Sequence, residues 1–146
     1  MIRSILVTCF VGLTAMPAAA FEAVTSPHSV TETMDRLVAA VEGAGATVFA
    51  RVDHGVGAAS VEMDLPDAQL LVFGNPRIGS PIMQDDLRAG LVLPLRVLVH
   101  EGEAGTVVTW QSPDEMFAGM DVDLDAKAVQ MMQGALGKLT GAATSE

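Results

Sequence analysis

Apolar residues along the chain switch between helical and extended spacing, and these switches mark the predicted elements. A helix is predicted to begin at Ser29, because the segment SVTE that starts there has the residues of a capping box. It is predicted to end at Gly43 and Gly45, since glycine accepts the left-handed conformation of a helix end. Its apolar side chains share one helical face: Val30, Met34, Leu37, Val38 and Val41.

The middle of the chain has the pattern of strands. Residues 46–53 alternate, 69–74 form a continuous apolar run typical of a central strand, and 61–65 suggest a short strand after a loop. Residues 91–100 predict a long strand interrupted by Pro94, which cannot donate to a ladder and therefore indicates a sheet edge or a bulge. The segment EGEAG predicts a hairpin turn into a returning strand at 106–111.

The remaining elements are predicted to be helical. Ser80-Pro81 predicts the cap and first turn of a short helix over about 80–89, and Ser112-Pro113 predicts another helix start. Asp125 is the predicted cap of a final helix with one apolar face, formed by Ala128, Val129, Met132, Leu136 and Leu139. The order predicts an α+β two-layer sandwich, with a mainly antiparallel or mixed sheet and helices packed on one face.

The first twenty residues resemble a secretory signal peptide. Arg3 precedes a short apolar run, and Ala18 and Ala20 supply the small residues that signal peptidase accepts. We therefore expect cleavage between Ala20 and Phe21, a periplasmic or secreted protein, and one domain over residues 21–146 without a membrane span. A retained membrane anchor is the alternative, although the run is short for a bilayer span.

Charge and cysteine content limit the possible functions. The formal net charge is −10, and it becomes one unit more negative when Arg3 is removed. A surface this acidic repels phosphate backbones, so nucleic acid is not expected as a partner. The single cysteine, Cys9, lies within the predicted signal peptide. The mature chain is therefore expected to lack disulfides, thiol catalysis and iron–sulfur clusters.

An ordered series of motifs resembles a known family. LLVFGNPRIGSPIM is followed by GLVLPLRV, an acidic turn and a strand ending in SP, while Asp53-His54 and Ala58-Ala59 come earlier. This series resembles domain of unknown function family 302 (DUF302), over about residues 29–139. The resemblance implies a compact α+β fold with helices on one sheet face, often as a homodimer, and no established reaction. Trp110 departs from the tyrosine expected at its position.

The loop FGNPRIGSPIM is the first candidate site. Asn75, Gly79 and Ser80 are predicted to present backbone amides and a hydroxyl to a small ligand, such as an anion at a helix start. The alternative is a turn at Asn75-Pro76 and a Ser80 that only caps its own helix.

Histidines at strand ends form the second candidate. Asp53-His54 and His100-Glu101 each end a predicted strand, so His54 and His100 could hold zinc or copper if those ends are neighbours. His54 could instead act as an acid–base catalyst oriented by Asp53. Several methionines also invite a copper hypothesis, but those with helical spacing fit a core equally well. Half-exposed structural histidines are the alternative.

Two functional classes remain. The favoured hypothesis is an exported module that binds a small ligand, metal or protein partner as a homodimer, without turnover. The alternative is a small hydrolase-like or acid–base enzyme that uses His54 with Asp53. No motif requires a cofactor, and no nucleophile or metal-ligand signature favours catalysis. A further alternative is that the loops serve dimer packing only, with the LVLPLRVLV strand as an interface edge.

Overall fold

The computed structural model describes residues 21–146, and the predicted signal peptide, residues 1–20, lies outside the described residues. Five antiparallel strands form one sheet in the order β1-β5-β4-β3-β2. The strands are β1 (Glu22–Ser26), β2 (Thr47–Asp53), β3 (Ala68–Gly74), β4 (Leu95–Gly102) and β5 (Gly105–Trp110). The helices are α1 (Val30–Gly43), α2 (His54–Ala59), α3 (Pro76–Asp85), the 3₁₀ helix η1 (Leu87–Leu91), α4 (Pro113–Met116) and α5 (Lys127–Thr144).

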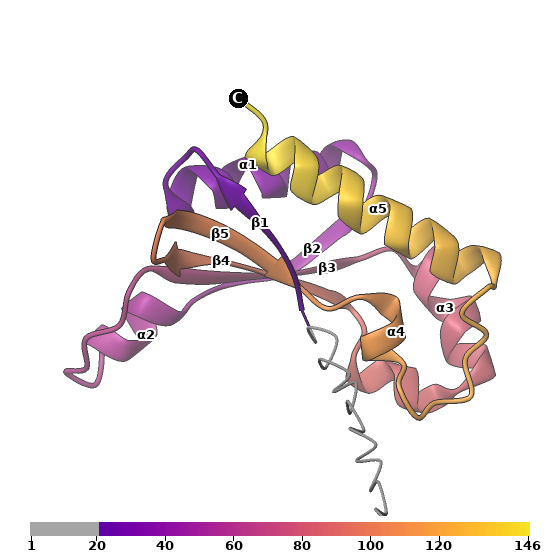
Figure 1. Ribbon diagram of the computed structural model, residues 1–146. Coiled ribbons are helices and arrows are strands. Elements are labelled where there is room, and N and C mark those ends of the chain that lie inside the picture. The colour runs from indigo at the N-terminus through magenta and orange to yellow at the C-terminus, as the bar shows by residue number, and fades with distance from the viewer. Residues whose placement is uncertain (1–20) are drawn as a thin grey trace, which may run out of the picture.

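Helices α1 and α5 pack on one face of the sheet, as Figure 1 shows. The Ser29 hydroxyl accepts a hydrogen bond from the Glu32 amide at 3.2 Å, which confirms the predicted start of α1. The apolar stripes predicted for α1 and α5 are buried against the inward side chains of the sheet, which are Leu71, Phe73, Leu95, Val97, Val99 and Val108. The predicted two-layer α+β architecture is confirmed.

The helix predicted over about 80–89, in and after the loop FGNPRIGSPIM, spans Pro76–Asp85 instead, so both of its predicted ends were wrong. Helix α3 begins at Pro76 with Asn75 as its N-cap, and Ser80 and Pro81 lie inside the helix. Within this loop a possible cap residue is followed by proline twice, at Asn75-Pro76 and at Ser80-Pro81. The first pair starts the helix because the Asn75 side chain accepts a hydrogen bond from the Arg77 amide at 3.0 Å.

The LVLPLRVLV segment is not an interface edge. Its strand, β4, starts at Leu95 after a cis Leu93–Pro94 peptide bond, and it lies between β5 and β3. Pro94 therefore precedes the ladder and removes no hydrogen bond from it. The edges of the sheet are β1 and β2.

Three further elements differ from the predictions. The segment at 54–59 forms α2 where a loop was predicted, because the Asp53 side chain caps it by accepting from the Val56 amide at 2.8 Å. Residues 61–65 form no strand. At the end of the chain, α5 is capped at Ala126 without a side-chain hydrogen bond, so Asp125 is not its cap.

Within residues 21–146, no helix has the length and apolar content needed to cross a bilayer.

A pair of substitutions checks which residue starts α3. Asn75→Ala removes the side-chain acceptor of the Arg77 amide, and we expect it to lower the free energy of unfolding by about 1 kcal/mol. Ser80→Ala changes an exposed residue inside the helix, and we expect a change within about 0.5 kcal/mol. Urea titration of both variants measures the difference. A larger loss for Ser80→Ala would contradict the cap assignment.

A carboxylate after α3 provides a pH-dependent test. Asp86 accepts hydrogen bonds from the Arg88 guanidinium at 2.6 Å, the Asp121 amide at 3.0 Å and the Arg88 amide at 2.9 Å. These bonds hold the pKa of the Asp86 carboxyl well below its ordinary value of 3.8. The stability that Asp86 contributes is therefore present above pH 4 and is lost as the pH falls below that value.

We expect Asp86→Asn to lower the free energy of unfolding at pH 7. We also expect the free energy of unfolding of this variant to fall less than that of the wild type when the pH is lowered below 4. Urea titrations at several pH values measure both effects. Asp85→Asn, which changes the neighbouring exposed carboxylate outside this network, is the control. An Asp86→Asn protein with the wild-type acid profile would exclude this role.

Candidate functional site

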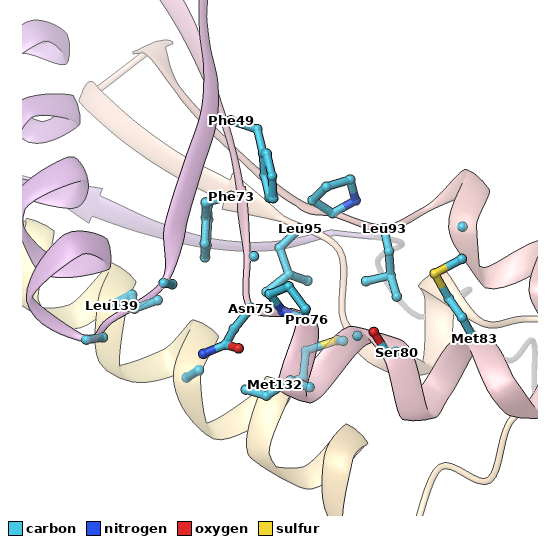
Figure 2. A pocket seen from close by; sticks show the side chains of 18 residues that line it. Phe49, Phe73, Asn75, Pro76, Ser80, Met83, Leu93, Leu95, Met132 and Leu139 are labelled. Carbon is cyan, nitrogen blue, oxygen red and sulfur yellow. The ribbon is translucent and has the colours of Figure 1, made fainter.

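A cavity of about 360 Å³ lies where the end of β3 meets α3, α5 and the segment before β4. Figure 2 shows its walls: Phe49 and Phe73 come from the sheet, and Met132 and Leu139 come from α5. The lining is almost entirely apolar and consists of Ala44, Ala46, Phe49, Phe73, Gly74, Asn75, Pro76, Ile78, Gly79, Ser80, Met83, Gly90, Leu93, Pro94, Leu95, Met132, Ala135 and Leu139.

Local sequence explains how these walls come together. Phe73 is the last inward side chain of β3, and α3 starts immediately after Gly74 and Asn75, so strand and helix meet at a sharp corner. From α5, the side chains of Met132, Ala135 and Leu139 reach the cavity, because their spacing of three and four residues keeps them on one helical face.

Phe49 reaches the cavity because of a bulge in β2. The pairing of β2 with β3 shifts register between Val48 and Ala50. Val48 packs against the core, while Phe49 is 56% exposed and its ring would lie 3.7 Å from a Cβ atom on Gly74. Phe49 was not predicted as a site residue, because the alternation of residues 46–53 carries no mark of the bulge. The exposed ring gives the site an aromatic rim.

The amides at the start of α3 are already used by the helix itself. The Arg77 amide donates to the Asn75 side chain, and the amides of Ile78 and Gly79 donate to the Asn75 carbonyl at 2.9 and 3.0 Å. These groups are therefore satisfied without an anion. The structure brings Asn75, Gly79 and Ser80 together at one cavity, where they adjoin apolar side chains.

Two polar groups of the lining remain available to a ligand. Asn75 uses its side-chain oxygen to cap α3, and within residues 21–146 its amide nitrogen has no protein hydrogen-bond partner. The hydroxyl of Ser80 likewise bonds to no other described residue, and Ser80 is exposed to solvent. A ligand with an apolar body and one hydrogen-bonding group matches this combination.

The two histidines lie at the same end of the sheet but on either side of β3. His100 pairs with Ala68 of β3, and Asp53, which precedes His54, pairs with Gln69 on the opposite edge of that strand. His100 is held by the Glu101 carbonyl at 2.8 Å and by the Thr109 hydroxyl at 3.1 Å. His54 is exposed.

No group of three or more histidine, cysteine or acidic side chains in the described part of the chain has the geometry to hold a metal ion. The carboxylate of Asp53 caps α2 by accepting from the Val56 amide. Among the methionines, Met83 and Met132 line the cavity, and Met34 and Met116 are buried in the core.

Comparison with known proteins places the fold and the family. The sequence profile described as "Domain of unknown function DUF302" matches residues 22–139. A crystal structure of an uncharacterized conserved DUF302 protein from Bacillus stearothermophilus is similar with a TM-score of 0.69 and 17% sequence identity, covering 87% of this chain and 97% of that one.

Curated relatives match part of the chain. A fluoride-specific ion channel, FluC 1, from Brucella suis biovar 1 (strain 1330) is 46% identical over 84 residues, which is 58% of this chain and 33% of that protein. FluC 1 of Brucella abortus biovar 1 (strain 9-941) matches with the same identity over 31% of its length. The match thus spans about a third of the length of these relatives.

Proposed function

The chain belongs to the DUF302 family, a domain of unknown function, and on this basis we propose that it is an exported homodimeric module that binds a small, largely apolar molecule. The observation that carries the proposal is the cavity beside α3. Its volume of about 360 Å³ falls within the range of about 300–1,000 Å³ that is typical of ligand pockets. The proposed export follows from the first twenty residues, and the proposed dimer follows from the family resemblance.

The chemistry of the lining favours a neutral ligand. No charged side chain of residues 21–146 lines the cavity, so an ionic group inside it would lose its hydration without gaining a partner. Burial of apolar ligand surface against Phe73, Leu95 and Met132 would supply most of the affinity. The Asn75 amide nitrogen and the Ser80 hydroxyl would orient the ligand's polar group.

The same lining favours binding over catalysis. Ser80 contributes a hydroxyl to the lining, and among the described residues no histidine, acidic side chain or lysine lines the cavity beside it. A serine nucleophile needs a base within hydrogen-bond reach to become reactive. The acid–base alternative with His54 and Asp53 would operate at the other end of the sheet, away from this cavity.

A neutral apolar fluorophore, N-phenyl-1-naphthylamine, tests the proposal. We expect saturable binding to the mature protein, with enhanced fluorescence. Gly79→Leu would fill the cavity, because a Cβ atom at Gly79 would lie 3.7 Å from Leu93 Cδ1 without a clash. We expect this variant to weaken probe binding at least about tenfold, the loss expected when about 1.4 kcal/mol of binding free energy is removed.

Gly137→Leu is the matched control. Gly137 lies in α5, is exposed and has nothing within 4 Å of its Cβ position, so the same substitution there leaves the cavity unchanged. Both variants replace a helical glycine with a better helix former, so thermal unfolding should show both folded. Equal probe affinity in Gly79→Leu and wild type would rule out binding at this cavity.

We propose a second candidate function, in which the protein works beside a fluoride channel. The 46% identity to part of the Brucella channels supports it. Because only about a third of each channel protein matches, the similarity concerns a segment of those proteins.

Fluoride sensitivity of the host separates this second function from the first. We expect a strain without the gene to grow less well than its parent in fluoride medium and equally well in chloride medium. Complementation with wild type should restore growth, and complementation with Gly79→Leu shows whether the cavity takes part. Identical growth of parent and deletion strain across fluoride concentrations would reject the second candidate.

A further inference from the structure

One face of the sheet is not covered by a helix of the described chain. Side chains alternate across the strands, and those that point away from α1 and α5 are half-buried or exposed. On this open face Leu70 of β3 pairs with Val52 and with Leu98, and Val72 pairs with Arg96. The open face is therefore apolar around Leu70 and Leu98, and it also carries Arg96, His100 and Thr109.

An apolar arm projects beside this face. We use "the arm" for residues 54–67, which are α2 and the segment that follows it. Figure 1 shows the arm extending from the end of the sheet, on the side away from α1 and α5. It carries four exposed large apolar side chains: Val56 (67% exposed), Val61 (63%), Met63 (66%) and Leu65 (47%). Exposed apolar groups gathered in this way are typical of an interaction surface.

Local hydrogen bonds hold the arm in shape. The amides of Val61 and Met63 both donate to the Ala58 carbonyl at 3.0 Å, and the Ser60 hydroxyl donates to the Gly57 carbonyl at 2.6 Å. Glu62 has a φ of 58°, in the left-handed region that side chains rarely adopt. The tip of the arm is thus a defined turn that presents its apolar side chains to the outside.

Charge distinguishes the possible occupants of this surface. The arm carries Glu62 and Asp64 among its apolar residues, and Arg96 lies on the open face. The ion pairs within the described chain involve His28, Arg51 and Arg88. Glu62, Asp64 and Arg96 therefore form no ion pair with another described residue. The arm of a second copy offers the acidic and apolar groups that the open face complements. Anionic lipid would instead be repelled by the arm's carboxylates.

We propose that two copies associate through these surfaces, with the arm of each lying on the open face of the other. The exposed Val61 and Met63 would cover Leu70 and Leu98, and Glu62 or Asp64 would pair with Arg96 of the partner subunit. A two-fold axis makes this exchange reciprocal, so both arms and both faces are covered at once. The inference rests on the homodimer proposed above and adds the surface that forms it.

Charge exchange tests the interface by sedimentation velocity over a range of protein concentrations. Arg96→Glu, which places like charges together, is expected to weaken dimerisation at least about tenfold. The triple variant Arg96→Glu, Glu62→Lys, Asp64→Lys restores opposite charges, and we expect it to recover most of that loss. Lys138→Glu makes the same charge change on an exposed residue of α5 and should leave the dimer unchanged.

A second pair of variants tests the apolar contact. Val61→Ser with Met63→Ser removes two exposed side chains from the arm, and we expect dissociation into folded monomers. Leu87→Ser, at a residue of η1 that is 79% exposed, is the control. Binding of N-phenyl-1-naphthylamine is measured for each variant, so that loss of the dimer is separated from loss of the cavity.

Three other outcomes would overturn the proposed interface. A wild-type monomer at all concentrations overturns the dimer together with its interface. A dimer that none of the arm or Arg96 variants weakens overturns the interface alone. Co-sedimentation of wild type with vesicles of phosphatidylcholine, lost in the Val61→Ser, Met63→Ser variant, assigns the arm to a membrane surface and also overturns the proposal.

Discussion

Burial of a single face of the sheet is the constraint on which the rest of this structure depends. The inward side chains of β3, β4 and β5 meet the apolar stripes of α1 and α5, and together they form one core. Residues 21–146 contain no cysteine, so no disulfide within them supplements that core. Stability therefore comes chiefly from apolar area removed from water between two layers. The opposite face of the sheet remains free for another role.

The cavity arises from the geometry of the same layers. Helix α5 crosses the sheet on the covered face, and α3 starts directly at the end of β3 and then packs beside α5 (Figure 1). The corner between strand and helix cannot be filled by the small residues that form it, Gly74 and Gly79. The space is left to long side chains such as Phe73 and Met132, which surround it without closing it. The tight corner and the proposed binding site are therefore the same feature.

The sequence predicted elements whose signals were local and redundant. The helix from Ser29 had both a cap and an apolar stripe, and it formed as predicted. Two helix-start signals competed at Asn75-Pro76 and Ser80-Pro81. The helix begins at the first of them, which lies directly after the end of β3. Strand β1 was not predicted, because the segment FEAVTS becomes a strand only through pairing with β5, far along the chain.

The candidate site was predicted in position but not in chemistry. Asn75, Gly79 and Ser80 could be picked from the turn residues around them, and they do line one cavity. Its apolar character comes from Phe49, Leu93 and Met132, which lie on three separate segments that only the folded chain brings together. The ends of β2 and β4 do lie at one end of the sheet, but the intervening strand β3 could not be placed from the sequence.

Strand β3 relates the two proposed surfaces to each other. The arm leads into its first residue, Ala68, and the cavity begins at its last residues, Phe73 and Gly74. From Ala68 to Gly74 the strand spans six residue steps, which is roughly 20 Å at about 3.4 Å per residue. β3 is hydrogen-bonded on both sides, to β2 and β4, so the arm and the cavity lie at opposite ends of a central strand. The proposed interface also includes Arg96 on the open face, and its neighbour Leu95 lines the cavity from the covered side of β4, so the two proposed sites adjoin each other at this strand.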